Sequence, residues 1–299
     1  ILNGLHIKHS ESKTGWNCTI PSFRHDVRHE TDLIEEILRC YGYENIKSSY
    51  SFSSQMQYAN DEEQPLFELK QYLSSIGFNQ CYNNSLQDIE EVKAFGVNPV
   101  SVMNPSSERM NTLRTTLHRG LLENLDFNFK NGSANTLIYE HGTVFEKKGK
   151  SLEGINQISD FSCLVHGSFY DQNVHFGAVE NNFFLLKGIA TNIFETLTKA
   201  KIKFIEDKNS YCNTFYRIVD GKKNTVGSIG VISPSFLDKL DIAHKTDVCV
   251  MDINTAFFTE HFNHSVKVKD IVLYPTVNRD LNFKLDSDAN LGEVCSAMK

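Results

Sequence analysis

The chain has 299 residues, 40% of them hydrophobic and 22% charged, so it can bury a core and is not intrinsically disordered. Its formal net charge of −7 excludes a strongly basic surface over the whole chain, such as many nucleic-acid-binding proteins carry. No stretch approaches the roughly 18 consecutive apolar residues of a transmembrane helix, and seven scattered cysteines without a CxxC pair indicate reduced thiols in a cytoplasmic protein.

The first zone of the sequence runs to about Ile46 and predicts one helix after an extended segment. We expect an extended segment at Cys18–Phe23 and a helix at Asp32–Cys40. The helix is favoured because Leu33, Ile37 and Tyr41 recur at helical spacing and would form one apolar stripe.

A linker and a larger domain follow. Residues 48–60 are rich in serine and poor in aliphatic side chains, which indicates a linker. The larger domain is predicted to span 61–266 and to begin with a helix at Asp61–Ile76. Pro65 in the first turn and Gly77 just past the end are typical of helix boundaries.

The rest of the 61–266 domain predicts short strands and a few helices. Apolar spacing and cap residues favour helices at Leu113–Lys130, Phe184–Lys199 and Ser233–Leu240. Strand patterns occur at Gln80–Ser85, Leu137–Glu140, Val144–Glu146, Phe161–His166, Phe215–Asp220, Thr225–Ile232 and Val248–Ile253. Because these strands do not alternate regularly with helices, they predict an α+β fold with an antiparallel sheet flanked by helices.

A third zone, 267–299, is too short to fold alone. It predicts a strand at Asp280–Leu285 and the first turns of a helix from Asn290. The chain starts with Ile1 and stops inside that helix, so we expect it to be an internal piece of a longer protein.

Four carboxylates form the sharpest candidate site. Asp32, Glu35 and Glu36 would share one face of the first helix, and Asp26 could fold back toward it from the preceding loop. Carboxylate oxygens are the ligands that Mg²⁺ and Ca²⁺ require. An alternative is that these residues serve only the helix terminus, since the Asp32-x-x-Glu35 spacing also fits a capping box and acidic residues stabilise a first turn.

No catalytic or nucleotide-binding residues are predicted. The sequence has no GxSxG, P-loop or HExxH motif. The glycine pair at Gly227–Gly230 is better explained by a bulge or close packing than by phosphate binding. Lysine clusters at 147–150, 199–203 and 222–223 are most simply solvated turns or strand ends, with RNA contacts as the alternative.

Several sequence blocks, in order, resemble the beta subunit of bacterial phenylalanine–tRNA ligase. The first blocks are PSFRHD at 21–26, DLIEE at 32–36, YGY at 41–43 and NI at 45–46. Later blocks are NPSSE at 104–108, LR at 113–114, GLLE at 120–123, YEHGTVF at 139–145, FFLLKG at 183–188, GVISP at 230–234 and YPTVNRDL at 274–281. The sequence departs from the family pattern at Phe23, Lys47, Arg119, Val231 and Ser233.

The resemblance implies a fold and a role. It implies that 61–266 is a class II aminoacyl-tRNA synthetase-like core in a catalytically silent copy, preceded at 1–47 by the C-terminal part of a small helical metal-binding domain. It also implies that 267–299 opens a ferredoxin-like anticodon-binding domain. In that family Asp26, Asp32, Glu35 and Glu36 would be Mg²⁺ ligands, and each matches in type and spacing.

The parent enzyme implied by the resemblance joins phenylalanine to tRNA(Phe) with ATP cleaved to AMP and pyrophosphate. The alpha subunit would carry ATP and the chemistry, the assembly would contain two alpha and two beta subunits, and this chain would brace alpha and help to position tRNA. An RNA-binding-type module and an editing domain would precede Ile1. We therefore expect the isolated chain to be inactive.

Two alternative functions remain, and the implied role also predicts self-association of the chain. The chain could be a protein-interaction module whose carboxylates pair with a partner's arginine or lysine and hold no ion. It could also bind nucleic acid through its first helical zone, although phosphate would repel an acidic helix face. Without the alpha subunit, exposed apolar helix faces should lead the chain to self-associate, with Asp61–Ile76 as one such face.

Overall fold

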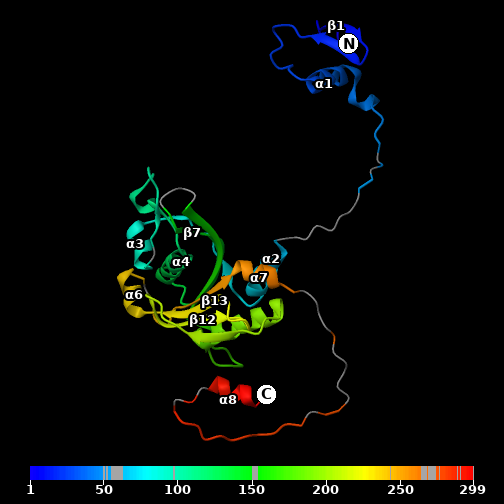
Figure 1. The fold of residues 1–299 in the computed structure, drawn as a ribbon. Helices are drawn as coiled ribbons and strands as arrows, with labels where there is room; N and C mark the ends of the chain where they lie inside the picture. Colours follow the sequence, from blue (N-terminus) through cyan, green and yellow to red (C-terminus); the bar gives the residue numbers. More distant parts are fainter. Residues whose placement is uncertain are drawn as a thin grey trace. The chain divides into compact units, whose positions relative to one another are not determined.

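The computed structural model describes residues 1–49, 51, 53–54, 63–96, 98–149, 154–242, 244–263, 268, 274–275, 277–287, 289 and 291–298. The chain divides into two compact units, Ile1–Asn60 and Asp61–Lys299, and each is described by itself. The N-terminal unit is blue in Figure 1, and the remaining colours belong to the second unit.

The N-terminal unit contains a hairpin and one helix. Strands β1 (Lys8–Ser12) and β2 (Gly15–Thr19) pair antiparallel, and α1 spans Glu30–Tyr41, followed by a 3₁₀ turn at Tyr43–Asn45. The sequence predicted the helix but not the hairpin. The hairpin was missed because its side chains are mostly polar and exposed, so no apolar alternation marks it.

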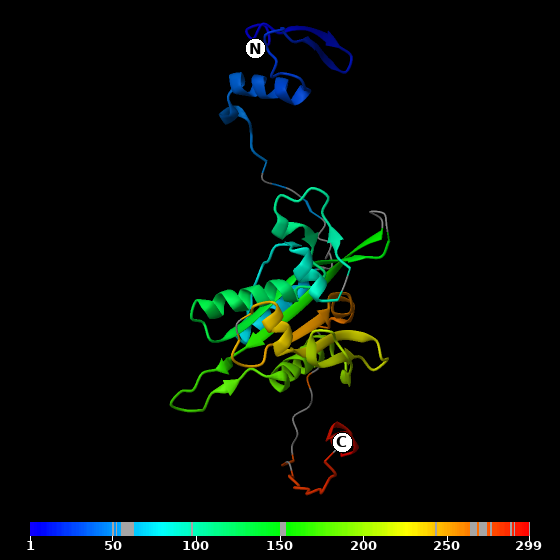
Figure 2. The same cartoon turned by 90° about the vertical axis from the view of Figure 1, so that its left-hand side faces the viewer.

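The second unit is built on a seven-stranded sheet in the part of the chain that is described. The strand order is β11-β12-β13-β14-β8-β7-β3, with every pair antiparallel except β3 and β7. The strands are β3 (Asn79–Gln80), β7 (Thr136–Lys147), β8 (Ile155–His166), β11 (Lys203–Glu206), β12 (Cys212–Val219), β13 (Thr225–Ile232) and β14 (Cys249–Asn254). In Figure 2 the paired β7 and β8 extend beyond the other strands.

Helices cover both faces of this sheet. They are α2 (Gln64–Ser75), α3 (Ile89–Ala94), α4 (His118–Lys130), α5 (Phe183–Ile193, continued by a π-helical turn at Phe194–Thr198), α6 (Pro234–Lys239) and α7 (Thr255–His261). Small sheets are formed by β4 (Leu86–Gln87), β5 (Val100–Ser101) and β6 (Thr112–Leu113), and by β9 (Ser168–Tyr170) with β10 (Val179–Glu180). A 3₁₀ turn at Glu108–Met110 and helix α8 (Leu291–Ala297) complete the elements.

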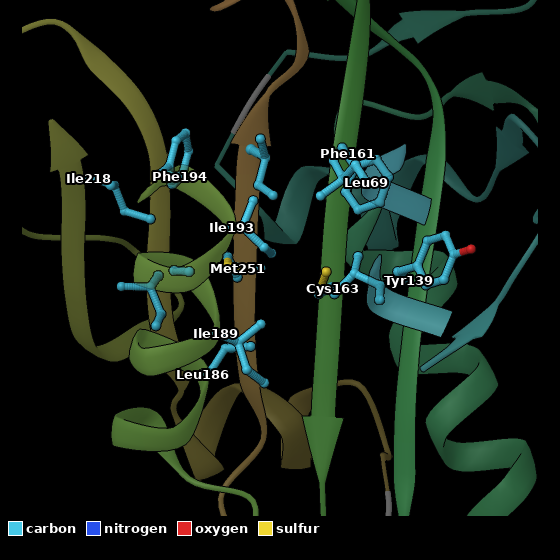
Figure 3. Packing of buried hydrophobic residues seen from close by; sticks show 14 of the residues in the cluster. Leu69, Tyr139, Phe161, Cys163, Leu186, Ile189, Ile193, Phe194, Ile218 and Met251 are labelled. Atoms are coloured by element: carbon cyan, nitrogen blue, oxygen red, sulfur yellow. The ribbon is translucent and has the colours of Figure 1, made fainter. Parts of the chain in front are cut away.

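Strand alternation divides the apolar side chains into two cores. On one face, buried residues of α2, α5 and α7 pack on the sheet, and Figure 3 shows Ile189 and Ile193 of α5 beside Met251 of β14. On the other face, α4 and α6 pack on Leu164 and Val250, the sequence neighbours of residues in the first core. β8 and β14 therefore each contribute alternate residues to both cores, as expected for a sheet that is buried on both faces.

The structure corrects several element boundaries. The helix expected at Leu113–Lys130 begins at His118, because Leu113 pairs in β6. The two strands expected around His141-Gly142 form one continuous strand, β7, because all twelve of its residues pair with β8.

Two further expectations were wrong. The strand expected at Gln80–Ser85 reduces to the two residues of β3, followed by a loop and β4. No strand forms at 280–285, where the described backbone is irregular. The start of the expected helix Asp61–Ile76 lies outside the described residues, and its described part is α2.

Candidate functional site

The four predicted carboxylates lie at the start of α1 and in the loop before it. The helix begins at Glu30, two residues earlier than the spacing suggested, so Asp32 is its third residue and is not its cap. Asp32 Oδ2 accepts hydrogen bonds from the backbone N–H groups of Arg28 and His29, both at 2.8 Å. These bonds lower the pKa of Asp32 and satisfy the free amide groups of the helix terminus.

Arg24 joins two of the carboxylates. Its Nη2 atom lies 2.6 Å from Asp26 Oδ2 and 2.8 Å from Glu36 Oε1. The other oxygen of Glu36 accepts from Arg39 at 2.9 Å, an i,i+3 pair on α1. The hydrogen bond from Arg24 holds the pKa of Asp26 down at about 2. Loop and helix are thus held together by one shared guanidinium.

The four carboxylates differ in their surroundings. The Glu36 side chain is 10% exposed and the Asp26 side chain 63% exposed. The Glu35 side chain is exposed and makes no hydrogen bond or ion pair within the described part of the chain. Arg24 therefore brings Asp26 and Glu36 together, whereas Asp32 serves the backbone and Glu35 faces solvent.

The donor atoms of this set suit Mg²⁺, which prefers carboxylate oxygen. In the described residues, however, no three histidine, cysteine, aspartate or glutamate side chains are grouped closely enough to hold a metal ion. An arginine lies between two of the four carboxylates instead. Mg²⁺ ligation by Asp26, Asp32, Glu35 and Glu36 stays a prediction.

A second group of polar residues, which the sequence patterns did not single out, lies on the sheet of the second unit. Asp252 of β14 accepts hydrogen bonds from Ser162 of β8 at 2.6 Å and Ser228 of β13 at 2.8 Å. His118, the first residue of α4, places Nε2 2.8 Å from Asp252 Oδ1 and Nδ1 3.0 Å from the hydroxyl of Tyr211. Together these contacts tie the start of α4 to three strands.

Asp160 lies diagonally across from Asp252 on neighbouring strands, because Asp160 pairs with Asn254 and Asp252 with Ser162. A cavity of about 460 Å³ opens here, and Asp160, Ser228 and Asp252 contribute to its lining. Burial and the charge of Asp252 raise the pKa of Asp160 to about 7. The cavity wall therefore holds two different carboxylates. Asp252 accepts from two serine hydroxyls and lies beside the His118 ring, whereas Asp160 is easily protonated.

A buried ion pair supports the neighbouring edge of the sheet. Arg114 Nη1 lies 2.6 Å from Glu140 Oε1, and the two side chains are 5% and 1% exposed. Glu140 also accepts from the backbone and side chain of Asn83 at 3.2 and 2.7 Å, and Arg114 donates from Nε to the carbonyl of Thr143 at 2.8 Å. Both charged groups are paired and hydrogen-bonded, so the pair holds the β3–β4 loop on β7.

The sequence did hold a signal for these polar groups. Ser162 and Asp252 interrupt runs of buried apolar residues, Phe161–Val165 in β8 and Cys249–Ile253 in β14, and a polar residue at such a position needs a partner. What the sequence could not supply was the partner, since His118 and Asp252 are separated by more than a hundred positions.

The cysteine thiols of the second unit are poorly suited to act as nucleophiles. The thiols of Cys163 and Cys249 are buried and that of Cys212 is partly buried. Burial raises their pKa values, so little thiolate forms at neutral pH. Across the described helices, none is long and apolar enough to cross a membrane.

Comparison with known proteins identifies relatives for nearly the whole chain. Residues 46–255 match the family model for the phenylalanyl tRNA synthetase beta chain CLM domain, and residues 1–43 match that for the tRNA synthetase B5 domain. The phenylalanine–tRNA ligase beta subunit of Thermotoga maritima is 26% identical over 292 residues, and that of Syntrophus aciditrophicus is 28% identical over 283 residues.

These alignments cover 95% and 90% of this chain but 36% and 34% of the two relatives. The beta subunit of Vibrio cholerae aligns over the whole chain at 26% identity and over 38% of its own length. The chain therefore spans little more than a third of the length of the relatives it matches.

The fold has a solved counterpart. The structure of pyrrolysyl-tRNA synthetase from Desulfitobacterium hafniense superposes with a TM-score of 0.52, covering 66% of this chain and 68% of that one at 12% identity. At this identity the likeness concerns the fold alone: a mixed α/β domain whose sheet is flanked by helices.

Proposed function

Because this chain belongs to the family of phenylalanyl-tRNA synthetase beta chains, we propose that it contributes B5 and central domains to a phenylalanine–tRNA ligase. The parent enzyme would attach phenylalanine to tRNA(Phe), cleaving ATP to AMP and pyrophosphate, as two alpha and two beta subunits in the cytoplasm. The single observation that carries this proposal is the family match over 46–255, together with relatives that align along most of the chain.

Within that enzyme the chain is proposed to have a supporting role and no chemistry of its own. The polar side chains on its sheet are engaged with one another: Asp252 holds His118 and two serines, and Glu140 holds Arg114. A site built for ATP and an amino acid would instead present cationic groups toward an open pocket. The class II synthetase-like core would thus act as a catalytically silent copy.

The proposed docking surface for the alpha subunit lies on α2 and the loop after β3. Phe67 on α2 is 56% exposed, and Tyr82 in that loop is 93% exposed. Large exposed aromatic side chains are typical of interface centres. The same helix buries Leu69 and Leu73 in the core, so it could present a firmly held outer face to a partner.

Mg²⁺ binding by the four carboxylates and a contribution to tRNA positioning complete the proposal. The support for the ion is the donor chemistry of Asp26, Asp32, Glu35 and Glu36 and their placement around one helix start. The support for the tRNA role is the family membership alone.

The test is a mixing experiment with a bacterial phenylalanine–tRNA ligase alpha subunit, read by size-exclusion chromatography with light scattering, with and without Mg²⁺. A mixed complex supports the bracing role, and full-length beta subunit serves as the positive control. Phenylalanine-dependent ATP turnover by this chain alone would contradict the silent-core proposal.

A second candidate is an interaction module without metal, and the Arg24 contacts favour it. Arg24 of this chain already neutralises Asp26 and Glu36, so these two carboxylates need no ion, and the carboxylates left for a partner's arginine or lysine are Asp32 and Glu35. In that case Asp32→Asn would weaken assembly with the alpha subunit to the same extent in Mg²⁺ and in chelator.

A further inference from the structure

The buried ion pair of the second unit leaves one guanidinium nitrogen of Arg114 without a partner. Its Nε donates to the carbonyl of Thr143 at 2.8 Å, and its Nη1 donates to Glu140 Oε1 at 2.6 Å and to the carbonyl of Asn83 at 3.3 Å. Nη2 makes no hydrogen bond within the described residues. The Arg114 side chain is only 5% exposed, and a polar group at such a depth is costly without an acceptor.

Nη2 lies beside a cavity of about 520 Å³, a volume within the range of about 300–1,000 Å³ that is typical of ligand pockets. Arg114 and Gly142 both line this cavity, and Nη2 lies next to the space that a β-carbon on Gly142 would take. Among the described residues, the buried side-chain atoms that lack a hydrogen bond do not include Nη2, so this nitrogen is not sealed inside the protein. A group that enters the cavity can therefore reach it.

The charges around the cavity favour a neutral hydrogen-bond acceptor as the occupant. Glu140 already neutralises Arg114, and its Oε1 lies 3.6 Å from the place where a Gly142 β-carbon would be. A carboxylate or phosphate that approached Nη2 would therefore also meet a like charge. Burial lowers the pKa of His141, and Lys70 adds to this effect, so the imidazole is neutral at pH 7. The other described residues that line the cavity are uncharged.

The rim of the cavity points to a peptide as the source of this acceptor. Tyr82, which is 93% exposed, lines the cavity and belongs to the proposed docking surface for the alpha subunit, so the two are continuous. Two more lining residues offer polar atoms. Asn84 Nδ2 has only the sulfur of Met110 as an acceptor, at 3.9 Å, and the hydroxyl of Ser85 makes no hydrogen bond within the described residues. A peptide chain supplies carbonyl and N–H groups that match such atoms.

We propose that this cavity receives a main-chain carbonyl group of the alpha subunit, whose oxygen accepts a hydrogen bond from Arg114 Nη2 while Tyr82 covers the peptide segment. The inference rests on the proposed bracing role and adds which chemical group of the partner is recognised. Glu140 and the carbonyl of Thr143 hold the guanidinium in place before the partner arrives, so little side-chain freedom is lost on binding.

The experiment fills the cavity without changing the ion pair. The change is Ser85→Phe, at a half-buried position whose side chain makes no hydrogen bond within the described residues. We expect it to weaken binding to an immobilised bacterial phenylalanine–tRNA ligase alpha subunit by about tenfold or more in surface plasmon resonance, because Nη2 would lose its acceptor. Ser168→Phe is the matched control. Ser168 is also half-buried, its hydroxyl makes no hydrogen bond within the described residues, and it does not line the cavity, so its variant should stay within about twofold of the wild type.

Ionic strength distinguishes a carbonyl from an anionic group. A neutral occupant predicts that Ser85→Phe causes the same loss of affinity at about 50 and about 300 mM KCl, because salt does not screen a neutral group. A loss that shrinks as salt rises would assign the cavity to an acidic side chain and overturn the inference. Competition by inorganic phosphate with the alpha subunit, seen in the wild type and absent in Ser85→Phe, would assign it to a phosphate group and overturn the inference as well.

The outcomes separate this inference from the proposed function. Equal affinity of the wild type and Ser85→Phe for the alpha subunit overturns the inference and leaves the bracing role standing. No complex with the wild-type chain, although the alpha subunit binds the full-length beta subunit used as the positive control, overturns the bracing role of this chain and the inference with it.

A second measurement covers the case in which Ser85→Phe does not fold. The photoreactive residue p-benzoylphenylalanine replaces Tyr82, where an aromatic side chain already stands in solvent. Irradiation of the complex should cross-link residue 82 to a peptide of the alpha subunit, which mass spectrometry then identifies. The same probe in place of Phe127, which is 67% exposed on α4, should give no such cross-link. A complex that forms without a cross-link from residue 82 to the alpha subunit would contradict the inference.

Discussion

Arg114 lies so close to Gly142 that a β-carbon built on this glycine would collide with the guanidinium. Gly142 sits in the middle of β7, paired with Asp160 of β8, and its missing side chain makes room for the Arg114–Glu140 ion pair. Glycine is therefore needed at this position because it leaves room for a charged side chain, and not because the backbone turns there.

We expect Gly142→Ala to lower the free energy of unfolding by about 2 kcal/mol, because overpacking forces the arginine from its hydrogen bonds. The control is Gly188→Ala in α5, where a β-carbon would meet nothing within 4 Å. Alanine favours a helix, so this control should be neutral or stabilising by about 0.5–1 kcal/mol. Urea unfolding of both variants tests the pair, and equal effects would contradict the prediction.

Removing the charge of Glu140 should be costly. Glu140→Gln leaves Arg114 buried without a carboxylate, which typically lowers the free energy of unfolding by about 3–5 kcal/mol. Glu90→Gln, which breaks the exposed pair between Lys93 and Glu90, should cost less than about 1 kcal/mol. Chemical denaturation monitored by circular dichroism measures both. A small effect at Glu140 would mean that water reaches the pair.

The chain should lose stability as the pH rises through neutrality. Burial and Asp252 raise the pKa of Asp160 from 3.8 to about 7, so the folded state binds its proton more tightly than the unfolded state does. Burial opposes the charge on His118, but Asp252 outweighs it and raises the pKa of that histidine. Each group contributes its full stabilisation below the pKa that it has in the unfolded chain, near 4 for the aspartate and 6.5 for the histidine. This stabilisation is lost as the pH rises through the higher pKa that the group has in the folded chain.

We therefore expect the Tm to fall between about pH 5 and about pH 8. Asp160→Asn, which cannot ionise, should flatten this fall, and scanning calorimetry in low-salt buffers would measure it. The same slope in the wild type and the variant would show that other groups carry the pH dependence.

The exposed face of α2 should matter for assembly and not for folding. Phe67→Ser is expected to weaken the complex with the alpha subunit by about tenfold or more, because a central aromatic side chain dominates an interface. Phe127→Ser is the matched control, since Phe127 is 67% exposed on α4, on the opposite face of the sheet. Surface plasmon resonance with immobilised alpha subunit distinguishes the two. Equal losses would place the interface elsewhere.

Local patterns were enough to find most helices of the second unit but not their exact ends. The apolar seam Leu121, Leu122 and Leu125 is read correctly from the sequence, and all three are fully buried. The start of α4 is set by His118, whose ring is held by Asp252 and Tyr211. When the start of a helix depends on contacts with a distant strand, the neighbouring sequence gives no signal of it.

The candidate metal site shows the same division. Spacing alone predicted that Asp32, Glu35 and Glu36 would fall on one helix, and α1 contains all three. The position of Arg24 between Asp26 and Glu36 was not predictable, because it depends on the conformation of the irregular loop before α1.

The sequence by itself determined the composition class, most helices of the second unit, the family resemblance and the four carboxylates, because each follows from residue types at short, regular spacings. Tertiary structure alone decided which polar groups meet: Arg114 with Glu140, His118 with Asp252, and Arg24 with Asp26 and Glu36. The reason is physical, since the energy of a buried charge depends on its neighbours in space, and chain folding brings those neighbours from distant positions.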